Sequence, residues 1–290
     1  MKTPRLSVPA AFLALLLLSG CGKAPPELPL GDRIENAEQV VAEIRTGLRG
    51  HAKSITVTFD YGSDIYSELN GAVEAWMEAA LQETENPAEG DYLRCRLGGY
   101  TWDSSFVREN GVWRYSVSLV PDYYDYLVQE EAVTEAVGEL LNGFQFSAET
   151  PEPEKIAVIY DTVCQTVAYD KVHRKNPYSH LKSTAYGALI AHSATCQGYC
   201  AALYRLLREC GIDCRIIKGM AGGEFHAWVI AAVDGQYYNL DPTWDAGAET
   251  YRFFLSGSED FPDHVYDARF QTKEFTDAYP IAKESFRKEG

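Results

Sequence analysis

The stretch that decides the fold is Thr195-Cys-Gln-Gly-Tyr199, with two later segments, Phe225-His-Ala-Trp228 and Leu240-Asp-Pro-Thr-Trp244. From Gln197 to Cys210 the apolar residues recur at helical spacing, and Gly211 suits the left-handed conformation that often ends a helix. The spacing therefore predicts that Cys196 lies at the N-terminus of a helix. Unpaired backbone N–H groups and the positive end of the helix dipole favour a thiolate there, which is the nucleophilic form of cysteine.

Strands are predicted after this helix over residues 215–218, 226–233 and 236–241, with a glycine-rich loop over 219–224. Asp234-Gly235 is a strong two-residue hairpin signal. Pairing across this turn places Trp228 opposite Asp241, with His226 on the same face one diagonal step away. We therefore expect the imidazole and the carboxylate to touch. A carboxylate-oriented imidazole facing a thiol at a helix start is the arrangement that acyl transfer through a thioester requires.

These segments together resemble the transglutaminase-like superfamily, whose papain-related core carries Cys on a helix and His and Asp on neighbouring strands. The resemblance rests on Cys196-Gln-Gly-Tyr199, His226-Ala-Trp228 and Asp241-Pro-Thr-Trp244, and it covers roughly residues 153–251. It implies an α+β fold in which the nucleophile helix packs on an antiparallel sheet. It also implies that Cys196 is the nucleophile, that His226 is the general base and acid, and that Asp241 orients the imidazole.

Two positions beside the nucleophile depart from the pattern of many bacterial members. Ala194 stands where they have glycine, and Cys200 stands where they have alanine, so a second thiol is expected one helical turn from Cys196. Neither change removes a catalytic group. The backbone N–H of Cys196 is expected to contribute to an oxyanion hole, and the sequence identifies no second donor. His173, His180, His192 and His264 carry no motif that assigns them a role.

Each of these residues also has a structural interpretation. A lone cysteine is commonly a small buried hydrophobe, a lone histidine on a strand is commonly a core or surface group, and Asp before Pro commonly marks a turn. A rival functional interpretation is a zinc site, because Cys196, Cys200, Cys210 and Cys214 have paired spacing. A continuous helix would place Cys196 and Cys210 about 20 Å apart, whereas zinc requires every sulfur within about 2.3 Å of the ion. The sequence therefore predicts neither a metal nor another cofactor.

The N-terminus predicts export and lipid attachment. Lys2 and Arg5 precede an apolar stretch over residues 8–18 and then Leu18-Ser-Gly-Cys21, which looks like a bacterial lipoprotein signal with Cys21 as the lipidated residue. The stretch is shorter than the roughly 18 residues that a membrane span needs. We expect residues 1–20 to be a cleaved signal peptide and residues 21–35 to be a proline-containing tether. The folded part would then lie outside the cytoplasm, at the cell surface or in the periplasm, anchored to the membrane by lipid.

Composition limits the partners. The net charge is −16, so nucleic acid is not an expected partner, and the chain contains no phosphate-binding glycine motif. After Cys21 and Cys196 an odd number of cysteines remains, namely Cys95, Cys164, Cys200, Cys210 and Cys214. At least one of them stays free or pairs between chains. A disulfide between Cys210 and Cys214 is conceivable, although reduced thiols are favoured. The oligomeric state is open.

The length suggests two folded units before any functional argument is made. We predict a small α+β domain over residues 36–125 and a transglutaminase-like domain over residues 126–290. The first domain should contain helices over 36–48 and 64–83, strands over 54–59 and 92–97, and a hairpin turning at Asn110-Gly111. Helices over 127–141 and 154–168 should lead into the second.

Three functional interpretations follow. The first is a membrane-anchored cysteine acyltransferase, peptidase or amidase that forms an acyl-thioester on a protein or cell-wall peptide and transfers it to an amine or to water. The second is an inactive binding or scaffold lipoprotein with the same fold. The third is a zinc-stabilised module.

Overall fold

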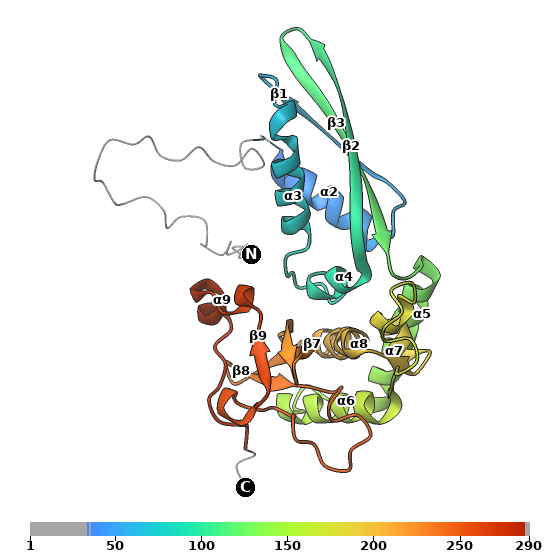
Figure 1. The fold of residues 1–290 in the computed structure, drawn as a ribbon, viewed down its shortest axis with the longest axis vertical. Helices are drawn as coiled ribbons and strands as arrows, with labels where there is room; N and C mark the ends of the chain where they lie inside the picture. Colours follow the sequence, from blue (N-terminus) through green and yellow to red (C-terminus); the bar gives the residue numbers. More distant parts are fainter. Residues whose placement is uncertain (1–33, 35, 288–290) are drawn as a thin grey trace, which may run out of the picture.

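The computed structural model describes residue 34 and residues 36–287, and it confirms a mixed α+β architecture (Figure 1). Its longer helices are α2 (Ala37–Arg49), α3 (Leu69–Ala80), α5 (Leu127–Phe144), α6 (Glu152–Thr166) and α8 (Cys196–Glu209). Short helices are α4 (Asp91–Arg96), α7 (Ala185–Leu189) and α9 (Lys273–Ala278). The strands are β1 (Ile55–Tyr61), β2 (Leu97–Glu109), β3 (Val112–Tyr123), β4 (Ala168–Tyr169), β5 (Ser193–Ala194), β6 (Cys214–Ala221), β7 (Glu224–Val233), β8 (Gln236–Leu240) and β9 (His264–Tyr266).

The N-terminal part is an antiparallel sheet in the order β1-β3-β2, with α2 and α3 beside it (Figure 1). Alternating residues of β1 are buried, which is the pattern of a strand with one face on a core. The β2–β3 hairpin turns at Asn110-Gly111, as predicted, and both residues have positive φ, as the favoured two-residue turns require. The second helix is shorter than predicted, because residues 66–68 form a 3-10 turn before α3.

The strand predicted over residues 92–97 is wrong, because Asp91–Arg96 forms helix α4. Tyr92 and Cys95, three residues apart, are both buried in the same core cluster as α8. Such spacing places them on one face of a helix. Gly90 precedes the helix with a φ of +62°, a conformation that glycine adopts without strain. Tertiary packing against the C-terminal core therefore overrides the strand propensity of this segment.

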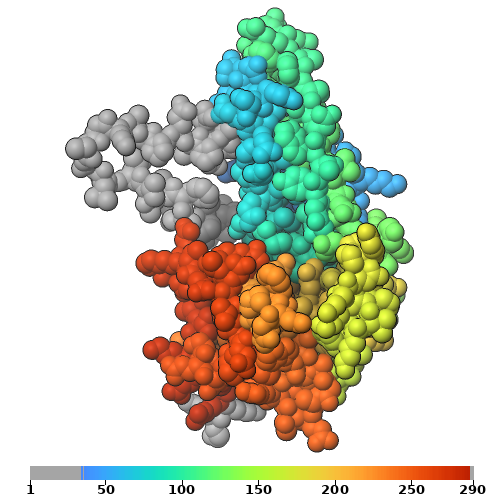
Figure 2. Space-filling view, in the orientation of Figure 1, coloured from blue at the N-terminus to red at the C-terminus, as the bar shows by residue number. Residues whose placement is uncertain are grey.

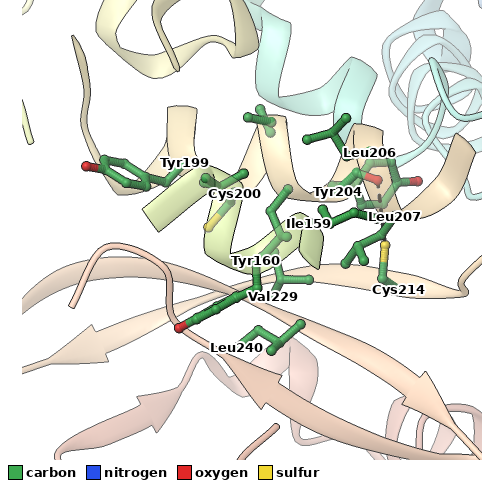
Figure 3. Packing of buried hydrophobic residues seen from close by; sticks show 14 of the residues in the cluster. Ile159, Tyr160, Tyr199, Cys200, Tyr204, Leu206, Leu207, Cys214, Val229 and Leu240 are labelled. Atoms are coloured by element: carbon green, nitrogen blue, oxygen red, sulfur yellow. Dashed lines mark hydrogen bonds between the residues drawn. The ribbon is translucent and has the colours of Figure 1, made fainter. Parts of the chain in front are cut away.

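The C-terminal part contains an antiparallel sheet in the order β8-β7-β6-β9, and α8 packs on it. Figure 3 shows side chains of α8 and α6 meeting those of the sheet. The labelled residues there are Ile159, Tyr160, Tyr199, Cys200, Tyr204, Leu206, Leu207, Cys214, Val229 and Leu240, which all belong to one buried cluster. Close packing of these apolar side chains fixes α8 at the sheet surface.

The two parts meet where α4 contacts α8 and β6, and in the space-filling view the blue-to-green N-terminal part lies against the yellow and orange C-terminal part (Figure 2). Arg215 of β6 donates to the carboxylate of Asp91 at 2.8 Å, and the Tyr204 hydroxyl of α8 donates to Glu83 at 2.5 Å. The buried Tyr92 hydroxyl of α4 donates to Glu130 of α5 at 2.6 Å. Charged and polar groups from both sides are thus paired at this junction. The boundary proposed near residue 125 stays a prediction.

The predicted signal peptide, the lipidated Cys21 and all of the tether except Ile34 lie outside the described residues. Ile34 is buried in the N-terminal core. Within the described part of the chain, no helix combines the length and apolar character that crossing a bilayer requires.

Candidate active site

Cys196 is the first residue of α8, as the spacing predicted. It follows the short strand β5, which pairs in parallel with β4, and Thr195 donates its backbone N–H to the Lys182 carbonyl at 2.8 Å. Gly198 allows this close approach, because a Cβ there would lie 2.6 Å from the same carbonyl oxygen. The glycine of the Cys-Gln-Gly-Tyr segment therefore lets the start of the helix sit tightly against the preceding loop.

His226 lies near the beginning of β7, with Nε2 at 2.8 Å from Oδ2 of Asp241. Because Nε2 is bonded to the carboxylate, Nδ1 is the ring nitrogen left for the hydrogen bond with Cys196. Burial disfavours the charged imidazole, but hydrogen bonds to Asp241 and Cys196 outweigh it and raise the pKa of His226 to about 9. The imidazole is therefore charged at neutral pH.

Asp241 follows β8 directly, and its side chain is fully buried. The predicted register is present, because Val229 pairs with Leu240, which makes Trp228 and Asp241 the next facing positions. Oδ1 accepts the backbone N–H groups of Thr243 and Trp244 at 3.0 and 3.2 Å. Burial raises the pKa of Asp241, but hydrogen bonds from His226 and His264 bring it below its ordinary value. Asp241 is a carboxylate.

His264 is the site residue that the sequence did not identify. It begins β9, which pairs with β6, and its Nε2 lies 3.0 Å from the same Oδ2 atom that His226 contacts. The His264 side chain is fully buried. The β6–β9 pairing, in which Ala221 lies opposite His264, brings it here, and no sequence motif signals this pairing.

Residues 140–242 match the model of the transglutaminase-like superfamily. This part of the chain is therefore similar to the core domain of that superfamily. Two curated relatives are the kyphoscoliosis peptidases of Homo sapiens and Mus musculus, each 24% identical over 161 residues. The alignment covers 51% of this chain but 23% of each relative, so the chain spans less than a quarter of their length.

Two solved structures are also similar to the chain. One is a crystal structure of a TGase, with a TM-score of 0.37 and 17% identity, covering 74% of this chain and 57% of that chain. The other is a proposed cysteine protease from Cytophaga hutchinsonii, with a TM-score of 0.33 and 13% identity, covering 59% of this chain and 69% of that chain.

A cleft of about 940 Å³ opens beside His226 in the C-terminal part of the chain. Trp244 and Phe225 line it together with Tyr169, and the Phe225 side chain is 89% exposed. Arg174 and Glu224 also line the cleft and form an exposed ion pair at 3.2 Å between its two sides. An exposed aromatic surface beside an imidazole is suited to holding a peptide chain.

The residues next to Cys196 have other roles. The Gln197 side-chain N–H donates to the Cys95 carbonyl of α4 at 2.8 Å, so this amide ties the helix start to the N-terminal part of the chain. Cys200 is fully buried, and burial raises its pKa well above the ordinary value for a thiol. Its position within the core makes Cys200 a packing residue and leaves Cys196 as the accessible thiol of this turn.

Among the described residues, the cluster of side chains close enough to share an ion is His226, Asp241 and His264 rather than the cysteines, but its contacts are not those of metal ligands. The nitrogen–oxygen distances of 2.8 and 3.0 Å are those of direct hydrogen bonds. Donor atoms around a tetrahedral zinc ion lie about 3.3 Å apart. The four-cysteine site is also opposed by a continuous α8, and the described cysteines are free thiols, including Cys210 and Cys214.

Proposed function

We propose that this protein is a membrane-anchored, extracytoplasmic Cys–His–Asp enzyme that forms an acyl-thioester on a protein or peptide. The observation that carries the proposal is that one imidazole, His226, bonds to Asp241 at 2.8 Å while Cys196 helps to raise its pKa. The accessible thiol at a helix N-terminus supports it further. The transglutaminase-like superfamily includes both acyltransferases and cysteine peptidases, which share this first half-reaction.

In the proposed mechanism, Cys196 Sγ attacks the carbonyl carbon of a carboxamide or peptide amide. The carbon–sulfur bond forms, and the backbone N–H of Cys196 stabilises the oxyanion. The His226 imidazolium then gives a proton to the departing nitrogen, the carbon–nitrogen bond breaks, and an acyl-thioester remains. An amine or water attacks the thioester, His226 accepts its proton, and the carbon–sulfur bond breaks to release the product.

The electrostatics of the site support these roles. With its pKa near 9, His226 holds the proton that the leaving amine needs at neutral pH. Asp241 stays ionised because its pKa is lowered, and it therefore fixes the ring with Nδ1 toward the thiol. The open cleft with exposed Phe225 beside His226 supports a polymeric substrate, either a protein or a cell-wall peptide.

The decisive experiment incubates the chain from Gly31 onward with a glutamine-containing protein and a labelled primary amine under reducing conditions. We expect covalent incorporation of the amine, or deamidation or cleavage seen by mass spectrometry. Either activity should be lost in Cys196→Ala and His226→Ala. Cys210→Ala is the matched control, because this half-buried thiol follows the other end of the same helix and should leave activity unchanged.

The products distinguish the alternatives. Incorporation that depends on Cys196 and His226 establishes transglutaminase chemistry, whereas dependent deamidation or cleavage alone establishes hydrolysis. Absence of every product, together with a Cys196 that resists alkylation, would instead support the scaffold lipoprotein.

The anchoring part of the proposal rests on Leu18-Ser-Gly-Cys21 alone. Expression of the full chain with labelled fatty acid should label the wild type in the membrane fraction. Cys21→Ser should abolish both the label and the membrane association, while Cys95→Ser should change neither. A labelled Cys21→Ser variant would refute lipid attachment at this residue.

A further inference from the structure

We propose that His264 is a positioning residue, held as a buried imidazolium that shares one oxygen of Asp241 with His226. This inference deepens the proposed function, on which it rests, and assigns a role to a histidine outside the predicted triad. It is carried by the hydrogen-bond partners of the His264 ring and by the rings that enclose it.

Both nitrogens of His264 face atoms that accept hydrogen bonds. Nδ1 lies 2.8 Å from the Pro262 carbonyl oxygen, and Nε2 lies 3.0 Å from Oδ2 of Asp241. A carbonyl oxygen only accepts, and an ionised carboxylate only accepts. A neutral imidazole has one N–H, so it would leave one nitrogen lone pair against an oxygen lone pair. His264 therefore needs both N–H groups, which makes it a cation.

The Asp241 carboxylate can accept hydrogen bonds from both histidines because each of its two oxygens accepts two hydrogen bonds. Oδ1 accepts two backbone N–H groups, and Oδ2 accepts the two imidazoles at 2.8 and 3.0 Å. A protonated Asp241 could not accept all four. The carboxylate is therefore fixed in orientation by donors on both oxygens, and His264 supplies the second donor to the oxygen that His226 also contacts.

Aromatic rings surround the His264 ring and exclude water from it. Phe261 stacks on it with ring centroids 3.9 Å apart, and the other rings lie at 4.6 to 5.5 Å, namely Trp244, Trp228 and Phe253. The faces of aromatic rings attract cations, and this attraction strengthens in a site without water. The enclosure thus suits a charged imidazole whose two N–H groups are both satisfied.

The charges of the site balance when His264 is included. Of the titratable side chains in the described segments, Asp241 and His226 are those that contact it, and Ala221 is its partner on β6. A Cys196 thiolate with His226 imidazolium is neutral as a pair, and Asp241 with His264 is neutral as a second pair. Without the His264 charge, forming the thiolate would leave a net negative charge in a largely buried site.

The first test needs no turnover. In the full chain with nitrogen-15-labelled histidine, the ring signals of His226→Gln should still contain one histidine with both nitrogens protonated at about pH 8. That signal should vanish in the double variant His226→Gln/His264→Gln. A neutral tautomer at position 264, with one unprotonated nitrogen, would overturn the proposal.

The second test measures alkylation of Cys196 by iodoacetamide as a function of pH in the full chain. His264→Gln keeps one N–H for Asp241 but removes the charge, so the profile should move upward by about one pH unit, a roughly tenfold slower reaction on the acidic side. His192→Asn is the matched control, because this exposed histidine has a φ of +51° that asparagine tolerates, and its profile should not move. A slower reaction of His264→Gln that is uniform across pH would mean a merely structural role and would overturn the proposal.

These readouts separate the two proposals. If the wild-type chain modifies no substrate but both tests succeed, the positioning role stands and the proposed turnover fails. If turnover is found and His264 is neutral, the reverse holds.

Discussion

The region around Asp241 and the junction around Glu83 each remove a carboxyl group from water, but the pKa falls at Asp241 and rises at Glu83. Asp241 receives two backbone N–H groups and two imidazoles, and its pKa falls below the ordinary value. Burial and the neighbouring Asp91 raise the pKa of Glu83 to about 7, against the opposing effect of Arg215. The comparison shows that the donors and charges around a buried acid, rather than burial itself, decide whether it stays ionised.

The largest expected effect comes from breaking the Asp241 side of the comparison. Asp241→Asn cannot accept hydrogen bonds from both histidines and both backbone groups, so the imidazole loses its orientation. We expect the rate of amine incorporation or hydrolysis to fall by about a thousandfold or more, as for the equivalent change in serine proteases. Asp161→Asn is the control, because this exposed carboxylate accepts a hydrogen bond from the Tyr251 hydroxyl away from the site. A variant within about tenfold of the wild type would contradict the assigned role.

The second prediction concerns the stability that His226 supplies. Its folded-state pKa of about 9 exceeds the ordinary 6.5, so the folded chain binds the proton more tightly. This stabilisation is fully present below about pH 6.5 and is lost as pH rises through 9, amounting to about 3 kcal/mol. The free energy of unfolding, measured in urea across this range, should decline with rising pH in the wild type but not in His226→Gln. Parallel pH dependence in the two proteins would disprove it.

The third prediction concerns Glu83, whose folded-state pKa also lies above its ordinary value. Its protonation stabilises the folded chain at low pH, and this contribution is lost as pH rises from about 4.5 through 7. We expect the free energy of unfolding, measured in urea, to decline by about 2 kcal/mol, a value reduced for solvent screening because Glu83 is partly exposed. Glu83→Gln should remove the decline, whereas Glu85→Gln should retain it. The contribution of Asp241 to stability depends on pH in the opposite direction, because it is lost as pH falls below about 4.

The smallest expected effect tests the link between the two regions. Gln197→Ala removes the hydrogen bond to the Cys95 carbonyl and should lower the free energy of unfolding by about 1 kcal/mol. Gln39→Ala, in an exposed i,i+4 pair with Glu43, should change it by a few tenths at most. Equal effects at both positions would show that the Gln197 contact adds no stability.

The elements next to the site follow from local patterns. The helix that begins at Cys196 is encoded by its apolar spacing, and the β7–β8 register is encoded by Asp234-Gly235, since a two-residue turn fixes which residues face each other. These two signals suffice to place His226 beside Asp241. The same kind of reasoning fails at residues 91–96, where contacts with a distant helix decide the conformation.

The sequence by itself therefore determined the nucleophile helix, the hairpin and the imidazole–carboxylate contact, because each depends on residues close together in the chain. Only the tertiary structure decided that His264 shares the Asp241 carboxylate, that Gln197 is held by α4, and that Glu83 lies beside Asp91 and Arg215. These contacts depend on the β6–β9 ladder and on the packing of α4 against α8. Side-chain spacing along one segment carries no information about such partners, because their positions are set by the packing of the whole core.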